Sequence, residues 1–271
     1  MNRPNSKRNL DMAIRRMGDG DEDYLRNRAV IANAVIGQMI QNAVIKGGSS
    51  LKIRFGDTVT RATTDLDVAR SVGSDEFAEG FERNLAEGWE GFTGRLVERP
   101  KAKPKGVPER YVMQPYEVKL SYLGNPWCTV IFEVGHDEIG DANEAEYVLP
   151  RDASDMLGAM GFPKLDPVAL MPLHYQIAQK LHGASEPASQ RAHDLVDLQV
   201  MASNESVDIR LLRETCEKLY AYRRMQPWPT PIVANVGWDA IYAEAATGLD
   251  VLQDVSDAVE WANQFLNRIA E

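Results

Sequence analysis

The chain has 271 residues, of which 44% are hydrophobic, and its formal net charge is −10. That length and apolar content suffice for one large domain or two medium ones with a proper core. The acidic balance argues against a body that coats nucleic acid by bulk attraction, because phosphate binding needs clustered Lys and Arg. Two distant cysteines, Cys128 and Cys216, match no metal or redox spacing, and no segment is apolar enough to span a bilayer. We therefore expect a soluble cytoplasmic protein with reduced thiols and no membrane partner.

Helices and strands alternate in the first half of the chain. Apolar residues at helical spacing, glycine breaks and β-branched runs carry these predictions. The expected elements are two helices over 8–43, a strand at 44–46, a helix over 49–55, a strand at 61–69, a helix over 77–89, and two strands at 116–122 and 128–134. The last two form a hairpin with a loop of several residues over 123–126.

After Leu149-Pro150 the pattern becomes helical. Helices are predicted at 152–160, 167–182, 190–201, 209–222 and from 238 to the end, with a break near Gly248. The sequence thus predicts an α+β fold with two domains. The first, 1–150, holds the sheet and the N-terminal helices, and the second, 151–271, is helical.

Two carboxylates mark the strand at 61–69. Asp65 and Asp67 stand two residues apart, so both side chains leave the same face of the sheet, while Leu66 and Val68 face the other way. Two negative charges so close together are unfavourable unless a cation neutralises them. Mg²⁺, which prefers carboxylate oxygens, is the simplest candidate for that cation. Chance surface pairs of this kind are common, so the pair alone is weak evidence of a site.

The turn before the 49–55 helix strengthens the case for a functional site at Asp65 and Asp67. Gly47 and Gly48 let the backbone approach an anion closely, and the amide groups at the start of a helix favour phosphate. Ser49 adds a hydroxyl donor. A glycine pair before a helix is more often only a tight turn, but its coupling to Asp65 and Asp67 favours a functional role.

These two segments resemble the AbiEii/AbiGii family of nucleotidyltransferase-like toxins, in the DNA polymerase beta nucleotidyltransferase superfamily. The resemblance rests on Ile-Lys-Gly-Gly-Ser-Ser-Leu at 45–51 and Arg-Ala-Thr-Thr-Asp-Leu-Asp at 61–67, within about residues 40–200. It implies a polymerase beta-like mixed sheet with flanking helices, and a C-terminal helical domain that closes the cleft. It also implies metal coordination by Asp65 and Asp67, and nucleotide contacts by Gly47, Gly48, Ser49 and Arg61.

A third carboxylate is expected from a neighbouring strand. Glu133 interrupts the nearly apolar run Cys128–Val134, and such a charge is costly unless it is paired or metal-bound. The alternative is an edge-strand carboxylate in water. By resemblance, Glu133 would join Asp65 and Asp67 as a metal ligand.

The helical half contains a second similar segment. Leu173, Ile177 and Lys180 follow helical spacing, so Lys180 projects from the edge of an apolar face toward the interior and needs an anion, such as a triphosphate. Asp194 lies one turn after Arg191, and a plain Arg191–Asp194 surface pair is the alternative. The family resemblance implies that Asp194 faces the cleft and orients Lys180 or the acceptor. Asp197 is the more structural of the two aspartates.

Charge is uneven along the chain. Between residues 95 and 110 six basic residues stand against two acidic ones, interleaved with proline and glycine: Arg95, Arg99, Lys101, Lys103, Lys105 and Arg110 against Glu98 and Glu109. A solvated surface loop is the alternative to an RNA contact here.

The resemblance implies a toxin that transfers a nucleoside monophosphate from an NTP to an acceptor with Mg²⁺ as cofactor. The expected acceptor is the 3′ end of tRNA, whose modification inhibits translation, and a cognate antitoxin would restrain the enzyme. No DNA partner is expected. Two alternatives stay open: nucleotidylation of a protein or a small molecule, and a non-catalytic nucleotide- or partner-binding module.

Overall fold

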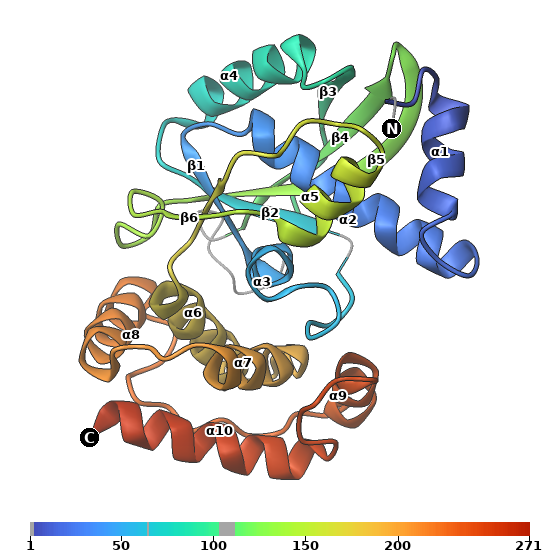
Figure 1. Ribbon diagram of the computed structural model, residues 1–271. Helices are drawn as coiled ribbons and strands as arrows, with labels where there is room; N and C mark the ends of the chain where they lie inside the picture. Colours follow the sequence, from blue (N-terminus) through green and yellow to red (C-terminus); the bar gives the residue numbers. More distant parts are fainter. Residues whose placement is uncertain (1–2, 64, 103–111) are drawn as a thin grey trace. The chain divides into compact units, whose positions relative to one another are not determined.

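A computed structural model describes residues 3–63, 65–102 and 112–271. Ten helices and seven strands lie in these residues (Figure 1). The chain folds into two compact units. The sheet unit comprises Met1–Arg54, Thr63–Asp137 and Ala145–Leu170, and the helical unit comprises Phe55–Ala62, Glu138–Glu144 and Met171–Glu271. Lys103, Lys105 and Arg110 of the predicted basic loop lie outside the described residues.

The sheet unit is built on one mixed sheet with the strand order β3-β4-β5-β2-β1-β7-β6. Its strands are β1 (Ala43–Lys46), β2 (Asp65–Arg70), β3 (Phe92–Glu98), β4 (Gln114–Tyr122), β5 (Asn125–His136), β6 (Glu146–Val148) and β7 (Val168–Leu170). Its helices are α1 (Lys7–Arg15), α2 (Asp21–Met39), α3 (Gly47–Phe55), α4 (Ser74–Glu87) and α5 (Arg151–Ala159). Two pairings at the centre are parallel, β2 with β5 and β1 with β7, and the others are antiparallel. The predicted α+β class is confirmed.

One face of this sheet carries the core. Leu66 and Val68 of β2 are fully buried, as is Phe132 of β5. Phe77 and Phe81, one turn apart on α4, place their rings against Phe132, with centroids 6.4 Å and 4.9 Å away. Because strand side chains alternate between faces, Asp65, Asp67 and Glu133 must lie on the opposite face from α4.

Some element boundaries differ from the predictions. The turn between β4 and β5 has only two residues, Leu123 and Gly124, both with positive φ (47° and 76°), so the predicted longer loop is wrong. Such a two-residue turn matches the right-handed twist of the flanking strands. Val168–Leu170, predicted as the start of a helix, is strand β7, and the helix begins only after Pro172. A run of three apolar residues is too short to show either period. Strand β3 and the short β6 were not predicted.

The helical unit holds α6 (Leu173–Ser185), α7 (His193–Asn204), α8 (Ile209–Arg223), α9 (Trp238–Ala246) and α10 (Val255–Ala270). Helix α6 packs against α7 and α8, and α10 packs against α7, α8 and α9 (Figure 1). The indole Nε1 of the buried Trp238 donates to the Ser189 carbonyl at 2.7 Å. Residues 145–170 belong to the sheet unit, because β7 pairs with β1 and α5 packs on α2, so this division differs from a boundary near Pro150.

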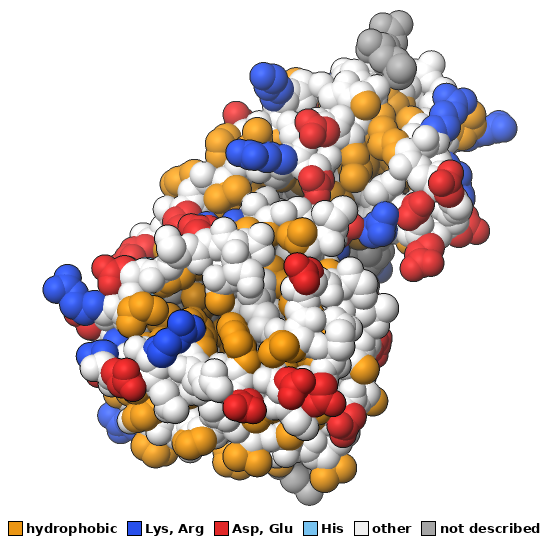
Figure 2. Space-filling view, turned by 60° about the horizontal axis from the view of Figure 1, so that its bottom comes forward, with side chains coloured by type: hydrophobic (Ala, Val, Ile, Leu, Met, Phe, Trp, Pro, Cys, Tyr) orange, Lys and Arg blue, Asp and Glu red, His pale blue; other side chains and the backbone are white. Residues whose placement is uncertain are grey.

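Charge on the surface is mixed. Figure 2 shows acidic and basic side chains interspersed with apolar ones over the face that it presents. Among the described residues, no helix combines the length and the apolar content needed to cross a bilayer.

Candidate active site

Three acidic side chains form a row on the open face of the sheet unit. β2 and β5 pair in parallel with Asp67 opposite Glu133, and Asp65 stands two residues before Asp67 on the same face. Since directly opposite residues on adjacent strands point to the same side, Asp65, Asp67 and Glu133 share that face. We call these three residues the acidic row.

The electrostatics of Glu133 show how close the row is. Partial burial raises the pKa of Glu133, and the negative charges of Asp67 and Asp65 raise this pKa further, while Lys46 opposes them. A cation shared by neighbouring carboxylates relieves the repulsion between their negative charges. The prediction that these three residues gather is therefore matched by their geometry.

Lys46 is a member of the site to which the sequence pattern assigned no role. It ends β1 directly opposite Asp67, so Lys46, Asp67 and Glu133 follow one another across three adjacent strands. Its ammonium group lies over Gly135, where an added Cβ would be 3.2 Å from Nζ. The position of Lys46 just before the glycine pair was the one indication in the sequence that it belongs to the site. Its pairing with β2 cannot be predicted from the local sequence pattern.

The glycine turn, Gly47 and Gly48, lies in close contact with the acidic row. Gly47 has φ of 67°, and a Cβ on it would lie 2.3 Å from Oδ2 of Asp67. A Cβ on Gly48 would lie 3.1 Å from Cβ of Thr63. Helix α3 begins at Gly47, so the amide groups of its first turn start beside Asp67. Only glycine combines this backbone conformation with so close an approach.

Ser49 has a structural function in this turn. Its side chain is only 2% exposed, and its hydroxyl donates to the Asp65 carbonyl at 2.6 Å and accepts from Nδ2 of Asn33 at 3.2 Å. The hydroxyl proton is thus used to fasten α3 to the start of β2. Phosphate contact by this hydroxyl stays a prediction, and the residue's backbone amide is the simpler donor.

The donor set of the acidic row suits a hard cation. In the parts of the chain that the structure describes, no group of three or more His, Cys, Asp or Glu side chains is placed so that it could hold a metal ion. Mg²⁺ does not need one, since it is usually held by one or two carboxylates together with waters and substrate phosphates. All three side chains of the row offer carboxylate oxygens, the ligands that Mg²⁺ prefers, so the residues present fit this metal.

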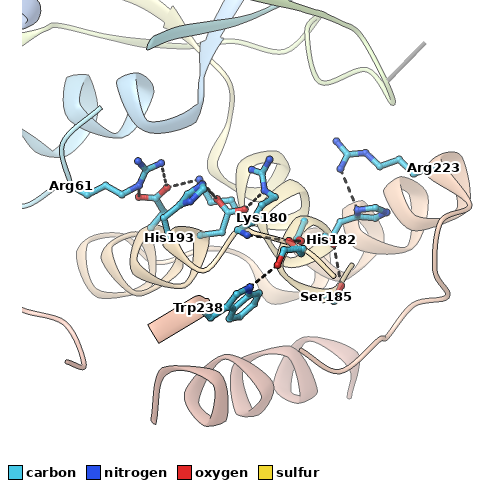
Figure 3. Close-up of polar contacts among 12 residues, drawn as sticks. Arg61, Lys180, His182, Ser185, His193, Arg223 and Trp238 are labelled. Carbon is cyan, nitrogen blue, oxygen red and sulfur yellow. Dashed lines mark hydrogen bonds and ion pairs between the residues drawn. The ribbon is translucent and has the colours of Figure 1, made fainter. Parts of the chain in front are cut away.

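The other predicted residues lie in the helical unit, around Lys180 (Figure 3). Lys180 is 5% exposed, and its Nζ donates to Oδ1 of Asp194 at 2.9 Å and to Oδ2 of Asp197 at 2.6 Å. The predicted inward direction of Lys180 is thus observed. Its counter-ions in the structure are two aspartates of α7, whereas the sequence pattern predicted a substrate anion.

Arginines complete this network. Arg61 contacts Asp197 through Nε at 3.0 Å and Nη2 at 3.1 Å, which is a bidentate pair. Arg191 donates from Nε to Oδ2 of Asp194 at 2.5 Å. Three cations therefore surround two carboxylates, and we call Arg61, Lys180, Arg191, Asp194 and Asp197 the charged network. Its formal charge is +1.

Burial and neighbouring charges shift the pKa values of three side chains in and around the charged network. Burial by itself raises the pKa of Asp194, but Arg191, Lys180 and His193 outweigh it and hold this pKa well below the ordinary range. Burial lowers the pKa of His193, and the nearby Asp194 charge opposes this shift. Burial and Arg223 lower the pKa of His182 to about 3, which leaves its imidazole neutral.

Gly183 explains how Arg191 reaches Asp194. A Cβ on Gly183 would lie 2.6 Å from Nε of Arg191 and 3.2 Å from Oδ2 of Asp194. The side chain of Arg191 therefore crosses the surface of α6 where that helix has no Cβ. The sequence pattern alone gave Gly183 no function, because the contact joins two helices.

The predicted site residues thus form two sets. Asp65, Asp67, Glu133, Gly47, Gly48 and Ser49 lie in the sheet unit, and Arg61, Lys180 and Asp194 lie in the helical unit. The fold defines the class of the protein as α+β, with a mixed sheet, flanking helices and a separate helical unit.

Comparison with known proteins identifies the family. Residues 31–265 match the family described as nucleotidyl transferase AbiEii toxin, type IV TA system. The chain belongs to this AbiEii family of nucleotidyltransferase toxins, as the resemblance of the two sequence segments predicted. A search of curated proteins finds no match.

Solved structures that are similar to this chain include the following two. One is MenT4, a nucleotidyltransferase toxin from Mycobacterium tuberculosis H37Rv, with 22% identity, a TM-score of 0.47, and coverage of 91% of this chain and 92% of that one. The other is JHP933 from Helicobacter pylori, with 14% identity, a TM-score of 0.48, and coverage of 93% of each chain.

Proposed function

We propose that this protein transfers a nucleoside monophosphate from an NTP to the 3′ end of tRNA in a Mg²⁺-dependent reaction that inhibits translation. The observation that carries the proposal is the acidic row, Asp65, Asp67 and Glu133, beside the positive-φ glycine turn that opens α3. A cation site next to helix amide groups is suited to a polyphosphate with its metal.

The sheet unit would hold the reacting groups. Asp65, Asp67 and Glu133 would hold Mg²⁺, which when bound neutralises phosphate charge and favours ionisation of the acceptor hydroxyl. The amide groups at Gly47 and Gly48 would bind the triphosphate, and the ammonium group of Lys46 would offset the charge of the row. The acceptor oxygen would form a bond to the α-phosphorus while the bond to pyrophosphate breaks.

Glu133 would help the bound metal activate the acceptor hydroxyl, whose proton would leave to solvent water. Without a cation, burial and the charges of Asp67 and Asp65 raise the pKa of Glu133. A cation held by the row would relieve this repulsion and keep the three carboxylates ionised.

The charged network of the helical unit would itself attract an anion. The charged network has one cation more than it has carboxylates, and the side chain of Arg191 is 50% exposed. Asp194 would keep Lys180 oriented, and the excess positive charge of Arg61, Lys180 and Arg191 would attract an anionic group. A family of type IV toxin–antitoxin systems also supports a cytoplasmic protein with a cognate antitoxin as its partner.

Transfer of labelled nucleotide tests the proposal. The protein is incubated with each of four labelled NTPs and separate pools of tRNA, protein and small molecules, with and without Mg²⁺. We expect Mg²⁺-dependent labelling of tRNA, and a loss of about 100-fold or more for Asp67→Asn, because the row stabilises charge in the transition state. The matched control is Asp75→Asn on the exposed first turn of α4.

Two results contradict the proposal. Labelling confined to the protein or small-molecule pool would remove tRNA as the acceptor. Growth arrest on expression that survives both Asp67→Ala and Lys180→Ala would remove catalysis as the cause of toxicity.

A further inference from the structure

The open face of the sheet continues beyond the acidic row. On β5, Thr129 precedes Ile131 and Glu133 by steps of two, so all three share this face. Thr129 lies opposite Lys119 on β4, and Lys119 lies opposite Arg95 on β3. One step further, Ser121 lies opposite Thr93. We call Thr93, Arg95, Lys119, Ser121 and Thr129 the basic strand face.

The basic strand face is hollowed. A cavity of about 420 Å³, open to solvent, is lined by all five of its residues. The side chains of Arg95 and Thr129 are exposed, and that of Lys119 is 38% exposed. Three hydroxyl groups and two cations thus line one part of this cavity, and Leu120, Pro126, Trp127 and Cys128 add an apolar part, in a space large enough for a sugar or a base.

Charge on this face is positive although the protein is acidic. Glu117, the acidic neighbour on β4, contacts both Nη1 of Arg99 and Nζ of Lys119 at 3.4 Å. The three cations Arg95, Arg99 and Lys119 thus face one carboxylate, a local charge of +2 in a chain of net charge −10. A local basic patch is the form that nucleic-acid binding must take in such a protein.

We propose that the basic strand face binds the sugar-phosphate backbone of the acceptor RNA. The bound RNA would be single-stranded, and its 3′ end would reach the acidic row. The four residue-to-residue steps from Thr129 to Glu133 span about 13 Å along β5, a distance that a few nucleotides cover. The cations would pair with phosphates, and the hydroxyls of Thr93, Ser121 and Thr129 would donate to phosphate or sugar oxygens. This inference rests on the proposed transfer to RNA and names the surface that selects the acceptor.

The test compares two double variants of the full-length protein. Arg95→Gln/Lys119→Gln removes two charges from the basic strand face. Arg83→Gln/Lys164→Gln removes two exposed charges elsewhere in the sheet unit, Arg83 being on α4, which packs against the other face of the sheet. The probe is a short single-stranded RNA with a 5′ fluorophore and a free 3′ hydroxyl, and anisotropy gives its affinity over a range of salt concentrations.

We expect the first double variant to bind this RNA about tenfold more weakly in 0.1 M salt. Its plot of log affinity against log salt should be shallower by about 1.4, since each phosphate contact with a single strand contributes about 0.7. The KM for RNA in the transfer reaction should rise, while affinity for NTP stays unchanged. The control variant should match the unsubstituted protein.

Unchanged RNA affinity and salt slope in the first variant would overturn the inference. So would equal losses in both double variants, which would indicate bulk charge instead of a site. Loss of binding to a co-expressed protein partner with RNA affinity intact would also overturn it and assign the face to that partner. The proposed function fails separately, if the unsubstituted protein transfers no nucleotide to RNA.

Discussion

At the scale of single residues, Gly47 joins backbone geometry to the site. Its φ of 67° and the 2.3 Å between a Cβ and Oδ2 of Asp67 mean that Gly47→Ala strains the backbone and displaces the carboxylate. We expect a stability loss of about 1–2 kcal/mol, the cost of a left-handed conformation for an L-residue with a side chain. Transfer activity should fall by roughly 100-fold, as expected for a misplaced reacting group. Urea unfolding and a transfer assay measure the two effects.

The control for Gly47→Ala is Gly158→Ala. Gly158 lies in α5, and a Cβ there would meet no atom within 4 Å. The change should leave transfer unaffected and raise stability by up to about 1 kcal/mol through helix propensity. Full activity in Gly47→Ala would show that the turn does not position Asp67.

Asp194 gives a prediction with a defined pH dependence. Asp194→Asn keeps the shape of the side chain but leaves Lys180 and Arg191 with one carboxylate fewer, and we expect a loss of about 3–5 kcal/mol at neutral pH. The pKa of Asp194 is lowered in the folded protein, so its stabilisation is present above the unfolded pKa of about 3.9 and is lost as the pH falls toward the folded pKa.

The difference between Asp194→Asn and the unsubstituted protein should therefore shrink below about pH 4. Denaturant unfolding at a series of pH values measures it, with the exposed Asp250→Asn as the control. A difference that stays constant across the acidic range would show that the carboxylate's charge is not what stabilises the network.

At the scale of elements, α6 and α7 meet where Gly183 makes room for Arg191. In Gly183→Ala the new Cβ would collide with Arg191, whose half-exposed side chain can move away. Net stability should change by less than about 1 kcal/mol, because alanine favours the helix while the Arg191–Asp194 pair is lost. NTP affinity, measured by calorimetry, should fall, and we expect an equal fall in Arg191→Gln.

A double variant shows whether Gly183→Ala lowers NTP affinity through Arg191 or through another contact. If Gly183→Ala acts only through Arg191, adding it to Arg191→Gln should lower NTP affinity no further. Additive losses would show that Gly183 acts by a different contact.

Elements also show what the sequence could and could not predict. The period of two in β2 correctly placed Asp65 and Asp67 on one face, and the helical period correctly turned Lys180 inward. Lys46 was missed because its pairing with Asp67 depends on the approach of two strands that are distant in sequence. Strand β7 was missed because three residues carry no readable period, and its identity comes from pairing with β1.

At the scale of the whole molecule, the helical unit depends on two short segments that interrupt the sheet unit. Residues 55–62 bring Arg61 to Asp197, and residues 138–144 bring Glu138 to Arg223, whose Nε lies 2.9 Å from Oε1. We expect a fragment of residues 171–271 to unfold at a lower denaturant concentration than the helical unit of the full chain, because Asp197 and Arg223 lose buried charge partners.

Trp238 offers a probe of that difference. It is buried in the helical unit, so hydrogen exchange of its indole proton, which is bonded to Ser189, reports on local opening in both fragment and full chain. Equal protection of this proton in the two would show that the segments 55–62 and 138–144 are dispensable.

The interleaving of the two units also bears on how such a protein can change over generations. No recombination at a single point of the gene separates the two units from each other, since segments 55–62 and 138–144 of the helical unit are encoded inside the stretch that makes the sheet. An exchange that replaced only the C-terminal helices would separate Asp197 from Arg61 and Arg223 from Glu138. The sheet with its acidic row and the helices with their charged network are therefore inherited together.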